Sequence, residues 1–189
     1  LRESVEIFRQ LKDDWYIAAK LLYLGDAQIR NGDILDAEQS TSESLAIFRR
    51  LDDKWGLGFA LGNAGEIARL NGDYESALAY EVEALRYQVD LGNKMDIAYE
   101  LEAIANTLAE QQFYERASKL WGFAEALRES IYSFLPPAYQ ADYMTYIAKV
   151  RRALGEDGFN QAWQEGRCLC MEDALSLASQ QSDVQAEHM

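Results

Sequence analysis

The chain has 189 residues, of which 49% are hydrophobic, and 32 acidic against 18 basic residues give a net charge of −14. This length allows one large domain or two small ones, and two prolines and twelve glycines are too few for a disordered or fibrous chain. We expect no direct binding to nucleic acid or to a membrane surface, because phosphate contacts need clustered lysine and arginine.

The amino-terminal sequence LRESVEIFRQ lacks the basic stretch and apolar run of a signal peptide. No apolar run in the chain is long enough to cross a bilayer. Two cysteines two residues apart do not indicate a disulfide framework. We therefore expect a cytoplasmic protein, and a start at Leu1 rather than methionine leads us to expect a fragment of a longer chain.

The chain repeats itself with a period of forty residues. The sequence ESVEIFRQLKDDW at residues 3–15 recurs as ESLAIFRRLDDKW at residues 43–55. Fourteen positions are identical between the first and second blocks of forty, and the third block matches more weakly in the same register. A fixed period of this size indicates stacked supersecondary units, because one unit cannot bury its apolar face alone.

Each unit predicts two helices joined by a short turn, because apolar residues recur at helical spacing on both sides of an Asn-Gly-Asp sequence. Gly72 suits the left-handed residue that ends a helix, and Asp73 suits the cap that begins the next helix. In the third unit the turn reads Gln-Gln-Phe, so it has to close without glycine. We expect the same topology there.

The period divides the first part of the chain into one incomplete and three complete units. We expect a partial first unit at residues 1–12 and units at about 13–52, 53–92 and 93–133, which together form the helical repeats of residues 1–133. The partial unit matches only a second helix, so the apolar side of that helix lacks its usual partner.

The remainder of the chain predicts a C-terminal helical cap at residues 134–180. Its first helix follows Pro136 and Pro137 and carries tyrosines 139, 143 and 146 along one side, and Gly155 ends it. A short helix and a last helix, MEDALSLAS, follow. We expect residues 181–189 to be a disordered tail.

The repeating unit resembles a tetratricopeptide repeat. The small residues that let paired helices cross closely in that motif match Gly25, Gly65 and Ala105 in the first helix and Ala37, Ala77 and Ala117 in the second. The period of forty exceeds the usual thirty-four, and leucine replaces the tryptophan of the first helix. The resemblance implies an all-α fold, a TPR-like α–α superhelix of antiparallel helix pairs with a C-terminal helical cap.

Residues 45–179 show a second resemblance, carried by ERASKLWGFAEALRES and LPPAYQADYMTYIAKVRRALGEDGFNQAWQEG. These segments look like the C-terminal portion of bacterial multidomain ATP-dependent regulators and related kinase or cyclase fusions, some of which carry a LuxR-type DNA-binding element. The resemblance implies protein interaction or effector sensing within a larger signalling chain.

The sequence carries no motif of a catalytic or cofactor site. Walker, Rossmann and Ser/His/Asp patterns do not occur, and the single histidine, His188, is the last residue but one. Cys168 and Cys170 lack the further ligands of a tetrahedral metal site. Trp15 and Trp55 recur at the unit period, which favours a structural role. We predict no enzymatic activity, no cofactor and no metal.

The first helices of such repeats line a concave groove, and helical spacing places aromatic, amide and charged residues on that side. They are Tyr23, Asp26 and Arg30 in the first complete unit, Phe59, Asn63, Glu66 and Arg69 in the second, and Tyr99, Glu102 and Asn106 in the third. This mixture suits an extended peptide or a helix. Its carboxylates disfavour an acidic C-terminal peptide.

We interpret the chain as a non-enzymatic protein–protein interaction module, the helical-repeat arm of a larger cytoplasmic bacterial signalling or transcription regulator. The groove would bind a partner protein or peptide, or another domain of the same full-length chain. One alternative is an effector sensor that binds a peptide or small molecule in the groove and changes its curvature. A second alternative is a dimerisation element that forms a homodimer.

Overall fold

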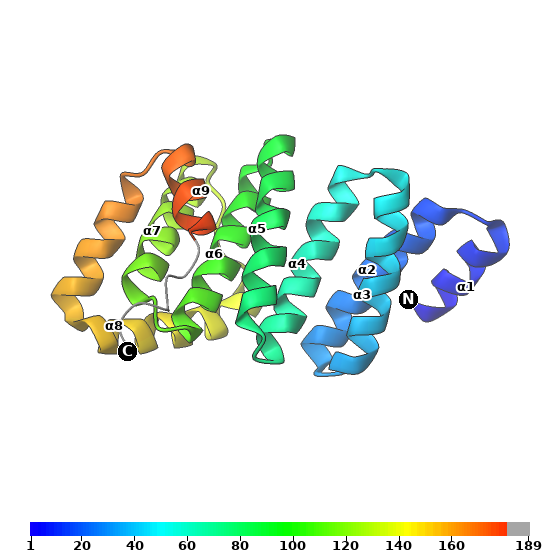
Figure 1. Ribbon diagram of the computed structural model, residues 1–189, viewed down its shortest axis with the longest axis horizontal. Coiled ribbons are helices and arrows are strands. Elements are labelled where there is room, and N and C mark those ends of the chain that lie inside the picture. Colours follow the sequence, from blue (N-terminus) through cyan, green and yellow to red (C-terminus); the bar gives the residue numbers. More distant parts are fainter. Residues whose placement is uncertain (181–189) are drawn as a thin grey trace, which may run out of the picture.

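The computed structural model describes residues 1–180, which form nine helices and no strand (Figure 1). In chain order the helices are α1 (Arg2–Leu11), α2 (Asp14–Asn31), α3 (Ile34–Leu51), α4 (Lys54–Leu70), α5 (Tyr74–Leu91), α6 (Lys94–Glu110), α7 (Tyr114–Ser130), α8 (Pro137–Arg167) and α9 (Met171–Ser179). The predicted tail at residues 181–189, which includes His188, lies outside the described residues.

Three antiparallel pairs, α2–α3, α4–α5 and α6–α7, stack side by side along the long axis of the molecule (Figure 1). The first helices of successive pairs contact one another, α2 against α4 and α4 against α6, so they form the inner side of the stack. The fold is therefore a TPR-like all-α superhelix, and the predicted fold class is confirmed.

The turns between and within the pairs close as the sequence predicts. The carboxylates of Asp13, Asp53 and Asp73 each accept a hydrogen bond from a backbone N–H in the first turn of the following helix. Gly72 is left-handed with φ 79°, and in the third unit Gln112 takes the same region with φ 68°, so that turn closes without glycine.

The predicted crossing positions of the helices are confirmed by how little space surrounds them. Ala37, Ala77 and Ala117 are fully buried. A Cβ added at Gly25 would lie 2.6 Å from Thr41 Oγ1, and one added at Gly65 would lie 2.6 Å from Glu81 Cγ. Helices that approach this closely leave no room for a larger side chain.

Trp15 ties the first complete unit to the second. Its indole Nε1 donates a hydrogen bond to Asp53 over 2.8 Å, and its ring stacks on Trp55 with centroids 5.9 Å apart. The same Asp53 carboxylate caps α4, so one side chain fixes both the start of a helix and the neighbouring tryptophan. These contacts support the structural role that the period predicts for both tryptophans.

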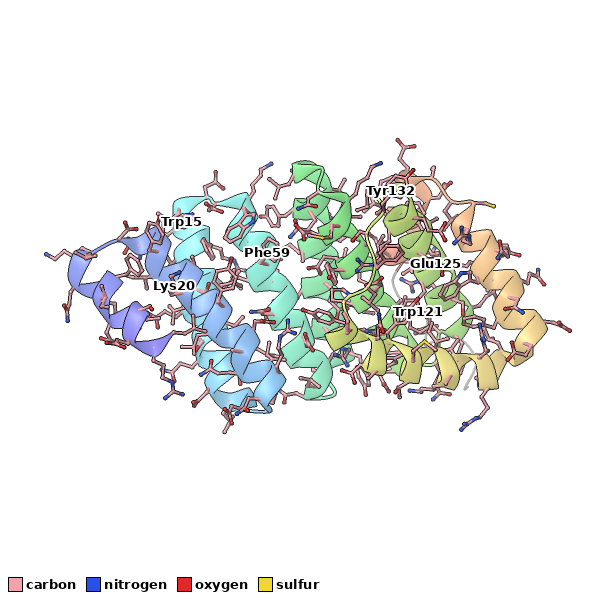
Figure 2. All side chains as sticks on the ribbon, turned by 180° about the vertical axis from the view of Figure 1, so that it is seen from behind. Trp15, Lys20, Phe59, Trp121, Glu125 and Tyr132 are labelled. Atoms are coloured by element: carbon pink, nitrogen blue, oxygen red, sulfur yellow. The ribbon has the colours of Figure 1, made fainter. Side chains whose placement is uncertain are left out.

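Helix α8 breaks at Gly155, where φ is 73° and ψ is 163°. Residues 156–167 pack against α7 at the end of the stack, where the Cβ that Gly122 lacks would meet the backbone oxygen of Trp163 at 2.2 Å. Residues 137–154 instead run across the helices of the stack, as Figure 2 shows from behind. The structure thus adds a feature that the sequence does not predict: part of the cap segment extends along the repeats.

The close contact between α7 and the second part of α8 gives a first prediction. We expect Gly166→Ala to lower the free energy of unfolding by about 1–3 kcal/mol, because its Cβ would lie 2.0 Å from the backbone oxygen of Lys119. Gly158→Ala is the matched control in the same helix, since the nearest atom to its Cβ would be 3.5 Å away. Urea unfolding followed by circular dichroism measures both, and equal stability of the two variants would contradict the packing described.

Candidate protein-binding groove

The inner side of the stack is built from positions forty residues apart. Equivalent places are occupied by Ala19, Phe59 and Tyr99, by Tyr23, Asn63 and Ala103, and by Asp26, Glu66 and Asn106. The side chains therefore differ in size and charge from one unit to the next, although the backbone repeats. Such a surface discriminates along its length, which suits one particular binding segment better than a repetitive ligand.

Aromatic side chains contact one another near the amino-terminal ends of α2 and α4. Phe8 of α1 stacks on Tyr16 of α2 with ring centroids 4.7 Å apart, and the rings of Trp55 and Phe59 in α4 lie tilted to each other with centroids 5.1 Å apart. Figure 2 shows Trp15 and Phe59 on neighbouring helices of the first two complete units. Tyr16 is 44% exposed, so this end offers apolar area to a partner.

Several predicted groove residues pair within their own helix. The Arg30 guanidinium lies 3.0 Å from the Asp26 carboxylate, and that of Arg69 lies 3.5 Å from Glu66. Asn63 Nδ2 donates a hydrogen bond to the backbone oxygen of Leu22 over 3.1 Å, so it links α4 to α2. The two carboxylates hold the arginines in place, whereas the amide of Asn63 serves the packing of the stack. Tyr23, which forms none of these pairs, is 48% exposed.

The third complete unit is less open than the sequence predicts. Glu102 is buried, and both of its oxygens accept hydrogen bonds from Arg128 of α7 at 2.7 Å. The Arg128 guanidinium also lies over the Tyr99 ring, 4.2 Å from its centroid. The charge of Glu102 is therefore balanced by Arg128 inside the protein. Glu102 positions Arg128, and Arg128 in turn contacts the Tyr99 ring. Asn106 is half-buried, and its side-chain oxygen has no hydrogen-bond partner.

The first part of α8 contacts residues of all three groove helices, α2, α4 and α6. The Tyr139 hydroxyl accepts a hydrogen bond from Arg30 of α2, whose guanidinium lies 4.8 Å from the centroid of the same ring. The Tyr139 ring also packs against Tyr99 of α6, with centroids 5.6 Å apart. One side chain of α8 thus spans two units of the stack.

Further contacts follow along the same face of α8. The Tyr146 hydroxyl accepts a hydrogen bond from Arg69 over 2.6 Å, and Tyr143 packs edge-on against Trp121 with centroids 6.3 Å apart. Lys149 pairs with Glu110 of α6 at 2.8 Å. Burial raises the pKa of Tyr146 to about 12, so its hydroxyl keeps its proton at neutral pH.

The sequence does not reveal two parts of the site, namely Arg128 and the fact that the α8 face with tyrosines 139, 143 and 146 covers the groove. The spacing of tyrosines 139, 143 and 146 predicts one face of a helix, and we place that helix in a terminal cap. The available signal is that residues 137–154 carry three tyrosines at helical spacing on one side. Nothing local shows that the segment turns back over the groove, because residues 131–136 before it have no regular structure.

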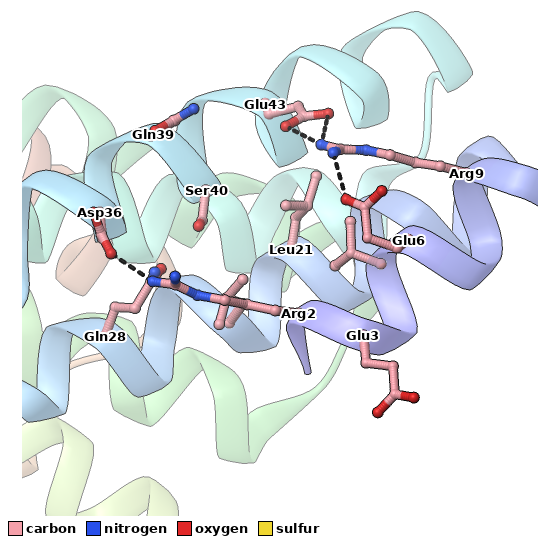
Figure 3. Close-up of a pocket in the computed structure, with 12 residues that line it drawn as sticks. Arg2, Glu3, Glu6, Arg9, Leu21, Gln28, Asp36, Gln39, Ser40 and Glu43 are labelled. Atoms are coloured by element: carbon pink, nitrogen blue, oxygen red, sulfur yellow. Dashed lines mark hydrogen bonds and ion pairs between the residues drawn. The ribbon is translucent and has the colours of Figure 1, made fainter.

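Two cavities lie away from the groove. The first, of about 430 Å³, lies between α1, α2 and α3 (Figure 3). Its wall carries ion pairs, Arg2 with Asp36 at 2.5 Å and Arg9 with Glu43 at 2.8 Å. The second, of about 450 Å³, lies beside α7 and α9.

Two carboxyl groups are buried behind the groove, between the second and third complete units. Glu81 accepts a hydrogen bond from the Thr107 hydroxyl over 2.9 Å, and its other oxygen has no partner. Glu100 lies against Gly62, and one of its oxygens also lacks a partner. Burial raises the pKa of Glu81 to about 8 and that of Glu100 well above its ordinary value. The Glu81 carboxyl is therefore mainly protonated at neutral pH.

Over residues 1–180 no group of three or more histidine, cysteine, aspartate or glutamate side chains is arranged to hold a metal ion. Within the same range no helix is long and apolar enough to cross a bilayer. Cys168 and Cys170 are both exposed, and Cys170 Sγ caps the first turn of α9.

Comparison with known proteins supports the repeat assignment over part of the chain. The family model of the tetratricopeptide repeat matches residues 16–88, which hold α2–α3 and most of α4–α5. Proteins of Mycobacterium bovis and Mycobacterium tuberculosis, named as candidate HTH-type transcriptional regulators, are 28% identical over 78 residues. The aligned part is 41% of this chain and 9% of those proteins. No solved structure matches the chain.

The buried carboxyl of Glu81 gives a second prediction. Its pKa rises from an ordinary 4.5 to about 8 on folding, so the folded chain binds the extra proton between these values. The stability it contributes is complete below about pH 4.5 and is lost as the pH rises to about 8. We expect Glu81→Gln, which stays neutral, to unfold less readily than the natural chain at pH 8 and to remove part of the pH dependence.

Urea unfolding at several pH values between 5 and 8 measures the effect. Glu75→Gln removes the same charge from an exposed place on the same helix, α5, and is the matched control. Coincident pH profiles for the two variants would show that Glu81 is not protonated in the folded chain.

Proposed function

We propose that the chain is a non-enzymatic protein–protein interaction module whose binding surface is the groove lined by α2, α4 and α6. The observation that carries the proposal is that residues 137–154 of the same chain already lie on this surface as a helix. A groove that accepts an amphipathic helix within one chain has the shape and the anchoring groups to accept one from a partner.

The groove residues would have different roles in binding. Arg30 and Arg69 each donate to a tyrosine hydroxyl and lie over or beside its ring, so they select an aromatic side chain with an acceptor at its tip. Tyr23 and Phe59 supply apolar area at the open end. Asp26 and Glu66 hold the arginines in place.

The third unit contributes Tyr99 and Asn106. Tyr99 is positioned through the buried pair of Glu102 and Arg128, and it contacts the ring of the covering helix. The Asn106 side-chain oxygen is buried, so Asn106 would act from below the surface of the groove. Asn63, bonded to the Leu22 carbonyl, acts through the packing of α4 on α2.

The chain would work as the helical-repeat arm of a larger cytoplasmic bacterial signalling or transcription regulator, and its groove would bind a partner protein or a domain of the full-length chain. The partial similarity to candidate HTH-type transcriptional regulators supports this context. The net charge of −14 favours a protein over nucleic acid as the partner. Both described cavities lie outside the groove.

Site-specific photo-crosslinking in cells that produce the full-length protein tests the proposal. A photoreactive residue replaces Tyr23 in the groove or, as the matched control, Glu38, which is exposed on α3. We expect one protein adduct from position 23 and none of the same mass from position 38. Arg30→Glu should lower the adduct yield by about tenfold, because it reverses the charge of a central anchor.

Adducts that contain only a second copy of the chain would support the dimerisation alternative instead. The same adduct from both positions, or no adduct at all, would contradict binding in the groove.

A further inference from the structure

We infer that residues 137–154 cover the groove, that the part of this cover up to Tyr146 is removable, and that the partner is an amphipathic helix that carries tyrosines at i, i+4 and i+7 and takes the place of that part. The inference rests on the proposed function of the groove and adds to it the chemistry of the partner and the competition that controls its access.

The cover is held firmly at one end and lightly at the other. Ile147 is 6% exposed and Val150 is fully buried, and both belong to the apolar cluster around α6 and α7. Tyr139 is 38% exposed, and among the described residues its side chain contacts the groove through Arg30 and Tyr99. The amino-terminal part of the cover can therefore leave the groove while its carboxyl-terminal part stays packed.

The segment before the cover allows such a movement. Residues 131–136 have no regular structure, and their two aromatic side chains, Tyr132 and Phe134, are 91% and 86% exposed. Helix α8 begins after Pro136 without a side-chain cap. Few contacts thus hold the start of the cover, and segments of this kind open locally with little cost.

The cover is also an imperfect occupant of the groove. Burial raises the pKa of the Glu66 carboxyl in the groove, and the Asp142 carboxylate of the cover adds to that rise, so the two acidic groups disfavour each other. Lys149 pairs with Glu110, which is the one ion pair that joins the cover to α6 among the described residues. A partner helix without an acidic residue at the position of Asp142 would bind where the cover binds and avoid this repulsion.

The anchors on the groove define the partner. Arg30 and Arg69 each combine a ring contact with a hydrogen bond to the hydroxyl at its tip. Tyrosine satisfies both demands, whereas phenylalanine satisfies only the ring contact. A partner that lies over the same anchors and continues toward Tyr23 and Phe59 would also cover the open aromatic end.

A labelled peptide with the sequence of residues 135–155 serves as the probe for the complete chain. In the variant Tyr139→Ala with Tyr146→Ala the internal cover loses its anchors, and we expect the peptide to bind about tenfold more tightly than to the natural chain, because a larger fraction of the groove is open. Met144→Ala, a change on the exposed side of α8, is the control and should bind like the natural chain. Fluorescence anisotropy measures the affinities.

Two further changes test the anchors themselves. Adding Arg69→Ala to the opened variant should abolish its gain in affinity for the peptide. A peptide with phenylalanine at positions 139 and 146 should bind less tightly than the natural peptide. Binding to the opened variant that is no tighter than to the natural chain, or a gain that survives Arg69→Ala, would overturn the inference.

Hydrogen exchange on the unaltered chain gives a test that does not depend on how the variants fold. We expect the amides of residues 141–146 to exchange about tenfold faster than those of residues 147–154. Equal exchange rates along the whole segment would overturn the removable cover. If position 23 gives a partner adduct but the opened variant does not bind the peptide, the removable cover is overturned and the groove remains a binding surface. The two proposals can therefore fail separately.

Discussion

The structure depends on the close approach of helices at small residues. The two helices of a pair cross closely where Gly25, Gly65 and the buried alanines leave room, and because no pair can bury its apolar face by itself, each pair packs on the next. Because the first helices contact one another along the stack, they form an inner surface whose side chains are not needed for the core. The groove is a consequence of this packing, and its chemistry is free to differ from unit to unit.

The protein uses much of this free surface itself. Arg128 neutralises Glu102, Arg30 and Arg69 hold tyrosines of α8, and Asn63 links two units. Even between the second and third units polar side chains are buried, and Glu81 is kept neutral by its surroundings. Side chains that would form an open charged groove are thus largely paired within the chain, while the aromatic end near Tyr23 stays open. An occupied groove with one open end favours exchange of one helix for another over binding to an empty cleft.

The local sequence predicts those features of the fold that depend on interactions within a few residues. The caps at Asp53 and Asp73, the left-handed Gly72 and the break at Gly155 follow from backbone geometry within a few residues, and the forty-residue period predicts which alanines are buried. The path of α8 and the partner of Glu102 depend on contacts between residues far apart in the chain, such as Arg30 and Tyr139, and no periodicity encodes them. For the same reason the spacing of the groove residues predicts their helix face but not which of them are already paired.

The most direct measurement is the distance between a spin label on the outer side of α8 and one on α3, obtained by double electron–electron resonance. Labels at Met144→Cys and Ala46→Cys report it once the exposed Cys168 and Cys170 are replaced by serine. We expect one narrow distance distribution for the free chain and a second, longer distance when the tyrosine-bearing helix is added in excess. A free chain in which α8 shows no preferred distance, or a distribution that the added helix leaves unchanged, would contradict a groove that holds and exchanges helices.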